Sequence, residues 1–160
     1  MESSNIWKPG DKLPENMSII DWITPTLAVG PVDQACDSEL MKLEGIKQII
    51  SIGSLYPTYL YPEVGIGHMK FPDIEDASPY IPDEIINILV KAIVTSSKMH
   101  KTFVHCAAGV SRSPGFITLA LAKLNNLSWE EAKQIVYTKR KVANIHPVTE
   151  YRLKRWLDNK

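Results

Sequence analysis

The feature that most constrains the fold is an alternation of hydrophobic period along the chain. Short runs of β-branched and apolar residues at 46–52, 66–71 and 102–105 are typical of buried strands. Between the last two runs, apolar residues recur at helical spacing over 82–98. A helix between two strands is the crossover that a parallel strand pair requires. The sequence therefore predicts an α/β fold with a central, mostly parallel sheet flanked by helices.

The amino-terminal part of the chain predicts a hairpin followed by a short helix. The segments 18–20 and 26–29 are β-prone and lie close enough in the chain to pair directly. A helix led by Asp37 or Ser38 should follow, and Gly45 should end it.

The carboxy-terminal part predicts three further helices. The first covers 113–124, directly after the predicted strand at 102–105. The second opens with the capping box of Ser128 and Glu131 and runs through Arg140. A proline at a helix start marks the last helix, which begins at Pro147.

Length and charge limit the classes of function. The chain has 160 residues, with no repeat or linker, so we expect one domain over 1–160. Its 18 Lys and Arg residues balance its 18 Asp and Glu residues, which excludes a strong field for nucleic acid or an anionic membrane. The segment 1–14 is polar and no apolar stretch is long enough to span a bilayer, so neither an export signal nor a membrane anchor is expected.

The chain has only two cysteines, Cys36 and Cys106. This number fits a reducing compartment and excludes a disulfide framework or a Cys-rich zinc site, so we expect a cytoplasmic protein. Cys36 lies in a predicted helical stretch without a basic neighbour. We expect it to be an inert packing residue, with a redox partner for Cys106 as the alternative.

The segment 105–114, with the sequence HCAAGVSRSP, carries the clearest chemical signal. It joins a predicted strand to a predicted helix, and backbone N–H groups at such a junction converge on a concavity that binds anions. The helix dipole adds partial positive charge there. Gly109 supplies the freedom that a tight turn needs. A tetrahedral oxyanion is the expected ligand.

Three side chains of this segment suit nucleophilic chemistry on that anion. The positive field favours the thiolate of Cys106, which is the nucleophilic form of cysteine. The guanidinium of Arg112 binds two phosphoryl oxygens at once. The Ser113 hydroxyl is placed to donate a hydrogen bond to the sulfur. A buried core thiol at Cys106 is the alternative, and the register of Arg112 with the helix start argues against it.

The same residues resemble a known family. Residues 105–113 match the H-C-x-x-G-x-x-R-S signature of the cysteine-based protein phosphatases, and the form AAGVSRS resembles the dual-specificity branch. Residues 23–30 and 45–51 are similar to strands of that branch, so the resemblance covers about 18–157. It implies a dual-specificity phosphatase-like fold and hydrolysis of phosphotyrosine, with phosphoserine and phosphothreonine, through a cysteinyl-phosphate. It implies no metal or organic cofactor.

The resemblance also assigns a phosphate-binding loop. Its members are Ala107, Ala108, Gly109, Val110, Ser111 and Arg112. The four variable positions among them are neutral, whereas lipid phosphatases of the superfamily tend to carry lysines there. The expected partner is therefore a phosphorylated protein, not nucleic acid or a membrane, and we expect a monomer.

A general acid is needed to protonate the leaving oxygen, and the family takes it from an aspartate on an upstream loop. Asp73 and Asp76 both qualify, and both lie in the stretch 72–79, which we predict to be a loop. We favour Asp76, because Ile74-Glu75-Asp76 followed by Ile81 resembles the branch's loop with one residue removed. Asp73 remains the alternative.

Other residues receive plainer interpretations. His105 should point to the face opposite Cys106 and shape the loop through hydrogen bonds. The basic cluster 139–141, with Arg152, Lys154 and Arg155 further on, is interpreted as a set of solvated helix faces, with a secondary phosphate site as the alternative. At 146–148 the chain reads His-Pro-Val where the family often has Asn after the proline, so the role of that Asn is not carried over.

Alternative functions remain within reach of the sequence. A phosphatase with a phosphoinositide, glucan or RNA 5′-phosphate substrate would use the same loop. A phosphate-binding module without turnover would be expected to lack the cysteine, the arginine or the upstream aspartate, and all three are present.

Overall fold

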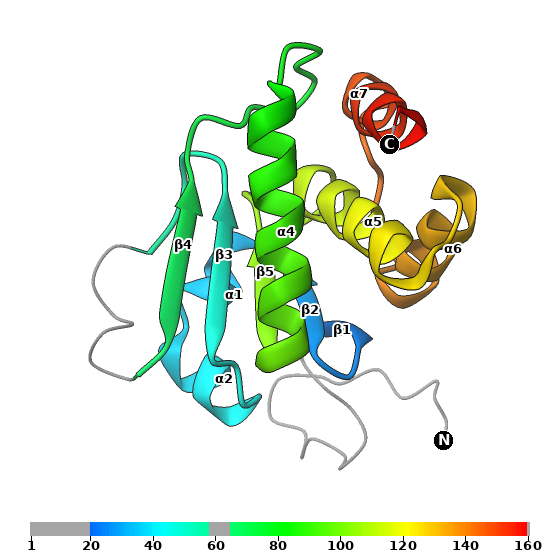
Figure 1. The fold of residues 1–160 in the computed structure, drawn as a ribbon. Helices are drawn as coiled ribbons and strands as arrows, with labels where there is room; N and C mark the ends of the chain where they lie inside the picture. Colours follow the sequence, from blue (N-terminus) through cyan, green and yellow to red (C-terminus); the bar gives the residue numbers. More distant parts are fainter. Residues whose placement is uncertain (1–19, 58–64, 160) are drawn as a thin grey trace.

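A five-stranded sheet in the order β1-β2-β5-β3-β4 forms the centre of the protein (Figure 1). A computed structural model describes residues 20–57 and 65–159. The strands are β1 (Asp21–Thr24), β2 (Leu27–Gly30), β3 (Gln48–Ile52), β4 (Gly67–Phe71) and β5 (Thr102–His105). β1 and β2 are antiparallel, and the pairs β2–β5, β5–β3 and β3–β4 are parallel. The predicted α/β fold with a mostly parallel sheet is confirmed.

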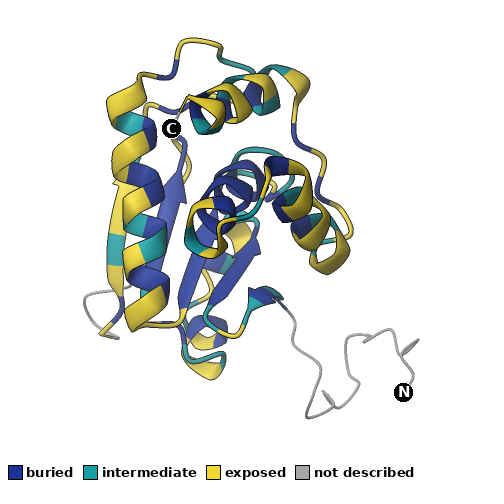
Figure 2. Cartoon of the chain, turned by 45° about the vertical axis from the view of Figure 1, so that its right-hand side comes forward, coloured by how far each residue is buried: buried dark blue, intermediate teal, exposed yellow. Residues whose placement is uncertain are grey.

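Helices cover both faces of this sheet. They are α1 (Val32–Ala35), α2 (Ser38–Leu43), α4 (Asp83–Met99), α5 (Arg112–Asn125), α6 (Trp129–Lys139) and α7 (Pro147–Asp158). The larger core lies between the sheet and α4 to α7, and the smaller core lies between the sheet and the helices α1 and α2. Figure 2 shows the inner strands β2, β5 and β3 largely buried and the edge strand β4 largely exposed, while α4 buries one side and exposes the other.

Sequence-encoded caps fix the helix ends. Asp37 caps α2, because its Oδ1 accepts a hydrogen bond from the backbone N–H of Leu40 at 3.0 Å. The predicted capping box of Ser128 and Glu131 is present at the start of α6. The structure confirms the predicted helices at 82–98, 113–124, 128–140 and from Pro147 onward. Each predicted helix end lies within two residues of the observed one.

The first strand differs from the prediction. The hairpin exists, but its first strand is Asp21–Thr24 and not 18–20; Ile20 precedes it, and residues 18 and 19 lie outside the described residues. Thr24 pairs with Leu27, so the two residues between them form the turn. This turn sets the register of the hairpin, and the first strand therefore occupies the residues directly before it. The single-turn helix α1 was not predicted, since four residues carry no helical period.

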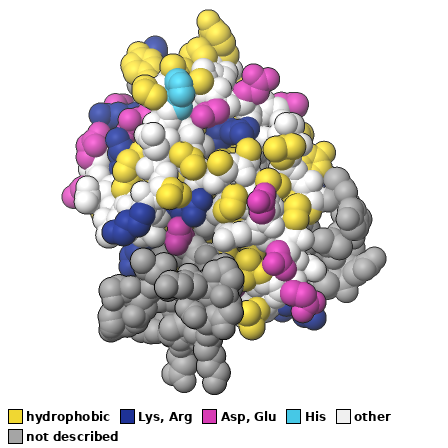
Figure 3. Space-filling model, turned by 180° about the vertical axis from the view of Figure 1, so that it is seen from behind, with side chains coloured by type: hydrophobic (Ala, Val, Ile, Leu, Met, Phe, Trp, Pro, Cys, Tyr) yellow, Lys and Arg dark blue, Asp and Glu magenta, His cyan; other side chains and the backbone are white. Residues whose placement is uncertain are grey.

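The surface matches the balanced charge of the sequence. In the view from behind, basic and acidic side chains are interspersed over the described face (Figure 3). Among the residues that the structure describes, no helix has the length and apolar character to cross a membrane.

Candidate active site

The segment singled out by sequence joins the middle of the sheet to a buried helix. β5 is buried along its whole length and ends at His105, and α5 begins at Arg112. Residues 106–111 between them form a loop at the carboxyl edge of the sheet, which we call the Cys106 loop. Loops at this edge are where open α/β sheets place their ligands.

Cys106 lies at the base of this loop and faces the start of α5. Its Sγ is 3.2 Å from the Ser113 Oγ and accepts a hydrogen bond of 3.5 Å from the Ser113 backbone N–H. Only 3% of the residue is exposed, yet it lines an open pocket of about 300 Å³. A donor pair at a helix start and access to a pocket distinguish this thiol from a packing residue.

The turn of the Cys106 loop depends on Gly109. Its φ is +71°, in the left-handed region, and a Cβ there would lie 2.5 Å from the backbone of Gly30. The loop also accepts a backbone hydrogen bond of 2.9 Å from Val32 N–H to the Ala107 carbonyl. The predicted role of this glycine in the turn is confirmed.

Arg112 lines the same pocket and joins two loops. Its Nη1 donates a 3.0 Å hydrogen bond to the carbonyl of Ile74, in the 72–79 loop. Gly53, with φ of +107°, lets the backbone pass beside the guanidinium, because a Cβ there would collide with Nη1. The arginine is therefore held at the pocket by backbone on two sides.

Asp76 reaches the pocket of Cys106 from the 72–79 loop. Its Oδ1 accepts hydrogen bonds of 2.7 Å from the Ser111 hydroxyl and 2.7 Å from the Thr149 hydroxyl. Thr149 is buried and in turn accepts from the backbone N–H of Ala77 at 2.9 Å. Because Oδ1 is occupied as a double acceptor, Oδ2 is the oxygen that suits a transferable proton.

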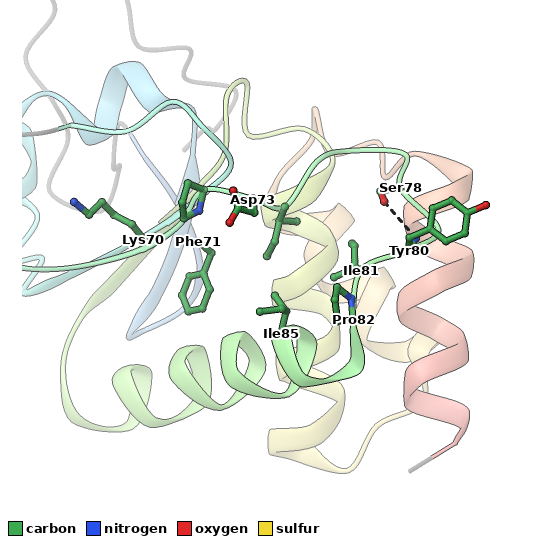
Figure 4. Close-up of a pocket in the computed structure, with 10 residues that line it drawn as sticks. Lys70, Phe71, Asp73, Ser78, Tyr80, Ile81, Pro82 and Ile85 are labelled. Carbon is green, nitrogen blue, oxygen red and sulfur yellow. Dashed lines mark hydrogen bonds between the residues drawn. The ribbon is translucent and has the colours of Figure 1, made fainter.

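Asp73 lies on the other side of the 72–79 loop. It lines a separate, mainly apolar pocket of about 420 Å³ between β4 and the start of α4 (Figure 4). Lys70, Phe71, Tyr80 and Ile85 surround that pocket, and Cys106 does not line it. The structure thus brings Asp76, and not Asp73, to the cysteine.

Residues near α7 complete the rim, and the sequence analysis did not find them. His146 donates its backbone N–H to the Ser111 hydroxyl at 2.9 Å, and Asn144 donates to the Val110 carbonyl at 2.7 Å. Together with Thr149 they lie more than 30 positions beyond the Cys106 loop, so no local pattern links them to it. His146 also caps α7, because its Nδ1 accepts from the Val148 N–H.

The interpretation of the basic residues as solvated faces is wrong for Arg152, whose side chain is 16% exposed and donates to the Ile81 carbonyl at 2.9 Å, and for Arg140. Its side chain is only 11% exposed and donates to the carbonyls of Gly109 at 2.9 Å and Ala108 at 3.2 Å. Its Nη1 pairs with Asp21 of β1 at 2.9 Å. The reason is that α6 ends beside the loop, so this one side chain turns inwards while its two neighbours are exposed.

His105 lies behind the loop as predicted. Its Nδ1 is 2.8 Å from the Cys106 carbonyl oxygen and its Nε2 is 2.6 Å from the Ser51 Oγ. Burial lowers the pKa of His105, and the charge of Arg112 lowers it further, against the opposing effect of the bond to Cys106. The expected hydrogen bonding to the loop is confirmed.

Cys36 contradicts its expected packing role, because it is exposed at the end of α1. Helix α1 ends at the buried Ala35, and Cys36 follows it outside the core. Partial burial of the thiol and the neighbouring Asp33 carboxylate raise the pKa of Cys36. Within residues 20–57 and 65–159, no group of three or more His, Cys, Asp or Glu side chains is placed to hold a metal ion.

Comparison with known sequences gives one family. A model described as the catalytic domain of dual specificity phosphatases matches residues 29–157. Mouse dual specificity protein phosphatase 14 is 32% identical over 122 residues, which are 75% of this chain and 60% of that protein. The human counterpart is 30% identical over the same length. The chain spans about 60% of the length of these relatives.

Comparison with solved structures gives the same fold. A mouse putative dual specificity phosphatase complexed with zinc tungstate matches with a TM-score of 0.79 and 20% identity, covering 93% of this chain and 92% of that one. PTPMT1 in complex with PI(5)P matches with a TM-score of 0.73 and 18% identity, covering 88% and 95%. At these identities the two likenesses establish the architecture alone.

Proposed function

The chain belongs to the dual-specificity phosphatase catalytic-domain family, and from this premise we propose that it hydrolyses phosphotyrosine, and also phosphoserine and phosphothreonine, in proteins. One observation carries the proposal. Cys106 and Arg112, from one segment of the chain, and Asp76, from the distant 72–79 loop, line a single pocket. A nucleophile, a phosphate-binding fork and an acid in one pocket are the groups that phosphoester cleavage requires.

The first step is attack of the Cys106 thiolate on phosphorus. A sulfur–phosphorus bond forms, the phosphorus–oxygen bond to the leaving group breaks, and Asp76 gives its Oδ2 proton to the departing oxygen. The loop N–H groups and the Arg112 fork bind the three non-bridging oxygens, whose charge they stabilise most strongly in the transition state. The products are a cysteinyl-phosphate and a free hydroxyl group.

The second step releases phosphate by hydrolysis. The Asp76 carboxylate takes a proton from water as the water oxygen attacks phosphorus, and the sulfur–phosphorus bond breaks. Ser113 Oγ, 3.2 Å from the sulfur, donates a hydrogen bond to the departing thiolate. Phosphate leaves, and Asp76 is protonated again for the next cycle.

Binding of the phosphoryl group is assigned to the loop and the start of α5. The proposed contacts are Ala107, Ala108, Gly109, Val110, Ser111 and Arg112. The tungstate in the mouse structure of the same fold is a tetrahedral oxyanion, which supports an oxyanion as ligand. The Ser111 hydroxyl donates a hydrogen bond to Asp76 and does not cap α5. This side chain therefore leaves the start of α5 open to the phosphoryl group.

A phosphorylated protein is the favoured substrate over a phosphoinositide. PTPMT1, of the same fold, was solved with PI(5)P, which makes a lipid headgroup the second candidate. Among the described residues that line the pocket, however, Arg112 is the one Lys or Arg side chain. A headgroup with further phosphates would need more cations than this pocket offers.

We further propose that the protein acts as a monomer in the cytoplasm.

The test compares substrates on the purified chain. The parent protein should hydrolyse a phosphotyrosine peptide, and a phosphothreonine peptide more slowly, without added metal and in the presence of EDTA. A Cys106→Ser variant should bind the peptide without turning it over, which also allows capture of the physiological substrate. Faster turnover of PI(5)P than of every peptide would replace the protein substrate with a lipid. Loss of activity in EDTA would refute the cysteine mechanism.

A further inference from the structure

Three polar side chains form a continuous hydrogen-bonded row across the sheet. His105 of β5, Ser51 of β3 and His68 of β4 belong to neighbouring strands in the order β5-β3-β4. The Ser51 Oγ is 2.6 Å from the His105 Nε2 and 2.7 Å from the His68 Nε2. The row begins at the Cys106 carbonyl, 2.8 Å from the His105 Nδ1, and ends at the edge strand.

The direction of each hydrogen bond in the row follows from the first. The Cys106 carbonyl can only accept, so the Nδ1 of His105 carries a proton. In a neutral imidazole the Nε2 is then an acceptor, and the Ser51 hydroxyl must donate to it. Because a hydroxyl has a single proton, Ser51 can only accept from His68. The Nε2 of His68 therefore carries its proton.

The surroundings keep both imidazoles neutral at pH 7. Burial lowers the pKa of His68 to about 4, and the charges of Lys70 and His105 add to this effect. The Tyr56 ring lies edge-on to His68 at 6.1 Å, and the Lys70 ammonium lies 5.1 Å from the same ring. The charge of Arg112 acts on His105 in the same direction as its burial. A second proton on either ring is therefore disfavoured in the folded protein.

We propose that Ser51 and His68 are positioning residues for Cys106, which act by fixing the tautomer of His105. The inference rests on the proposed function only for its catalytic consequence. With its proton on Nδ1, His105 holds the Cys106 carbonyl on the side of the sheet behind the loop. The carbonyl oxygen, which carries partial negative charge, is thereby kept from the pocket where the thiolate and the phosphate dianion must lie.

The opposite tautomer would undo this arrangement. With its proton on Nε2, His105 would present a lone pair to the Cys106 carbonyl, and the buried carbonyl would lose its donor. A buried acceptor without a partner costs on the order of 1–3 kcal/mol. The peptide could recover that loss by turning its oxygen towards the pocket, where it would repel both anions. Ser51 and His68 disfavour this state, because the Ser51 hydroxyl, while it accepts from the His68 Nε2–H, directs its single proton to the His105 Nε2.

The direct test is the tautomeric state of the two histidines in the parent protein. Nitrogen-15 NMR of the imidazole rings at pH 7 distinguishes a protonated from an unprotonated ring nitrogen, and single His variants assign the signals. We expect a protonated Nδ1 in His105 and a protonated Nε2 in His68. A protonated Nε2 in His105 would overturn the proposal, whatever the enzyme's activity.

The catalytic consequence is tested with Ser51→Ala and with two substitutions of His68. His68→Leu removes the N–H donor, whereas His68→Gln keeps an N–H at a similar place. We expect Ser51→Ala and His68→Leu to lower kcat/KM on a phosphotyrosine peptide by about tenfold, the scale of one lost buried hydrogen bond. The midpoint of the pH dependence of Cys106 alkylation by iodoacetamide should move to higher pH in both. His68→Gln should stay within about threefold of the parent.

A neighbouring variant separates this effect from general damage to the edge strand. Lys70→Gln alters the same strand and the same ring contact but breaks no bond of the row, so its kcat/KM and alkylation midpoint should match the parent. Equal losses in His68→Gln and His68→Leu, or a loss in Lys70→Gln of the same size, would overturn the positioning role. If Cys106→Ser kept full activity, the proposed function would fail instead, and the NMR result would still decide the tautomers.

Discussion

Cys36 and Cys106 both lie beside the end of a helix, but at opposite ends. Cys36 follows the last residue of α1, where backbone carbonyls point outwards, and the carboxylate of Asp33 lies one turn away. Cys106 faces the first turn of α5, where N–H groups point outwards, and its sulfur accepts from the Ser113 N–H. The same side chain thus meets partial negative charge at one site and partial positive charge at the other.

The supporting structure differs as much as the local charge. Helix α5 has 14 residues and is buried over most of its length, so its first turn is held rigidly at the pocket. Helix α1 has four residues, and the thiol at its end is exposed. From this comparison we expect the reactivity of each cysteine to follow the helix end and the packing around it, and not its exposure.

The largest expected effect separates the two cysteines directly. Cys106→Ser should hydrolyse para-nitrophenyl phosphate at less than about 10⁻³ of the parent rate, because the covalent nucleophile is lost. Cys36→Ser should retain the parent rate. Steady-state kinetics with circular dichroism as a check on folding measures both. Substantial activity in the Cys106 variant, or a large loss in the Cys36 variant, would break the comparison.

The next largest effect tests whether Asp76 or Asp73 is the general acid that acts with Cys106. Asp76→Asn should lower kcat on a phosphotyrosine peptide by about 10² or more, and should cost less on an ester with an acidic leaving phenol. Asp73→Asn, in the same loop but in the other pocket, should change kcat by less than about tenfold. If the large loss that depends on the leaving group appeared in Asp73→Asn instead, the assignment would reverse, and Cys106 and Arg112 would keep their roles.

A smaller effect tests how the Cys106 loop is held. Arg140→Ala removes three hydrogen bonds, two of them to loop carbonyls, so kcat/KM should fall by about tenfold. Asp21→Asn keeps those two loop bonds and weakens only the pairing to β1, so it should cost less. Lys139→Ala is the exposed control from the same helix end and should match the parent. Equal activity in all three variants would show that the loop does not depend on this arginine.

The smallest effect concerns the other cysteine. Asp33→Asn removes a carboxylate that, after burial, raises the pKa of Cys36. The midpoint of Cys36 alkylation by iodoacetamide should therefore move to lower pH, because the Asp33 carboxylate no longer disfavours the thiolate. Mass spectrometry of the Cys36 peptide follows it separately from Cys106. A shift of the midpoint to higher pH would show that the Asp33 carboxylate does not raise the pKa of Cys36.

Local chemistry explains which parts of the fold could be predicted. The strand β5, the Cys106 loop and the start of α5 are adjacent in sequence, and the positive φ of Gly109 follows from the turn between them. Helix α6 carried its own capping box. The first strand was misplaced because the turn after Thr24, and not β propensity, sets its register.

The rest of the site depends on contacts between distant parts of the chain. Thr149 and Arg140 reach the loop from α7 and the end of α6, and nothing in their own neighbourhoods distinguishes them from ordinary helix residues. Ser51 and His68 meet His105 only because β3 lies between β5 and β4 in the sheet. Parallel strand order is fixed by crossovers, so a single sequence does not specify these neighbours.

The most direct test of the central claim is to trap the covalent intermediate. The parent protein is mixed with para-nitrophenyl phosphate, quenched in acid within the first turnovers, digested and mapped by mass spectrometry. The account predicts a phosphoryl group on the peptide that contains Cys106 and none on the peptide that contains Cys36. Phosphate found on any other residue, or steady turnover with no phosphorylated peptide at any quench time, would contradict it.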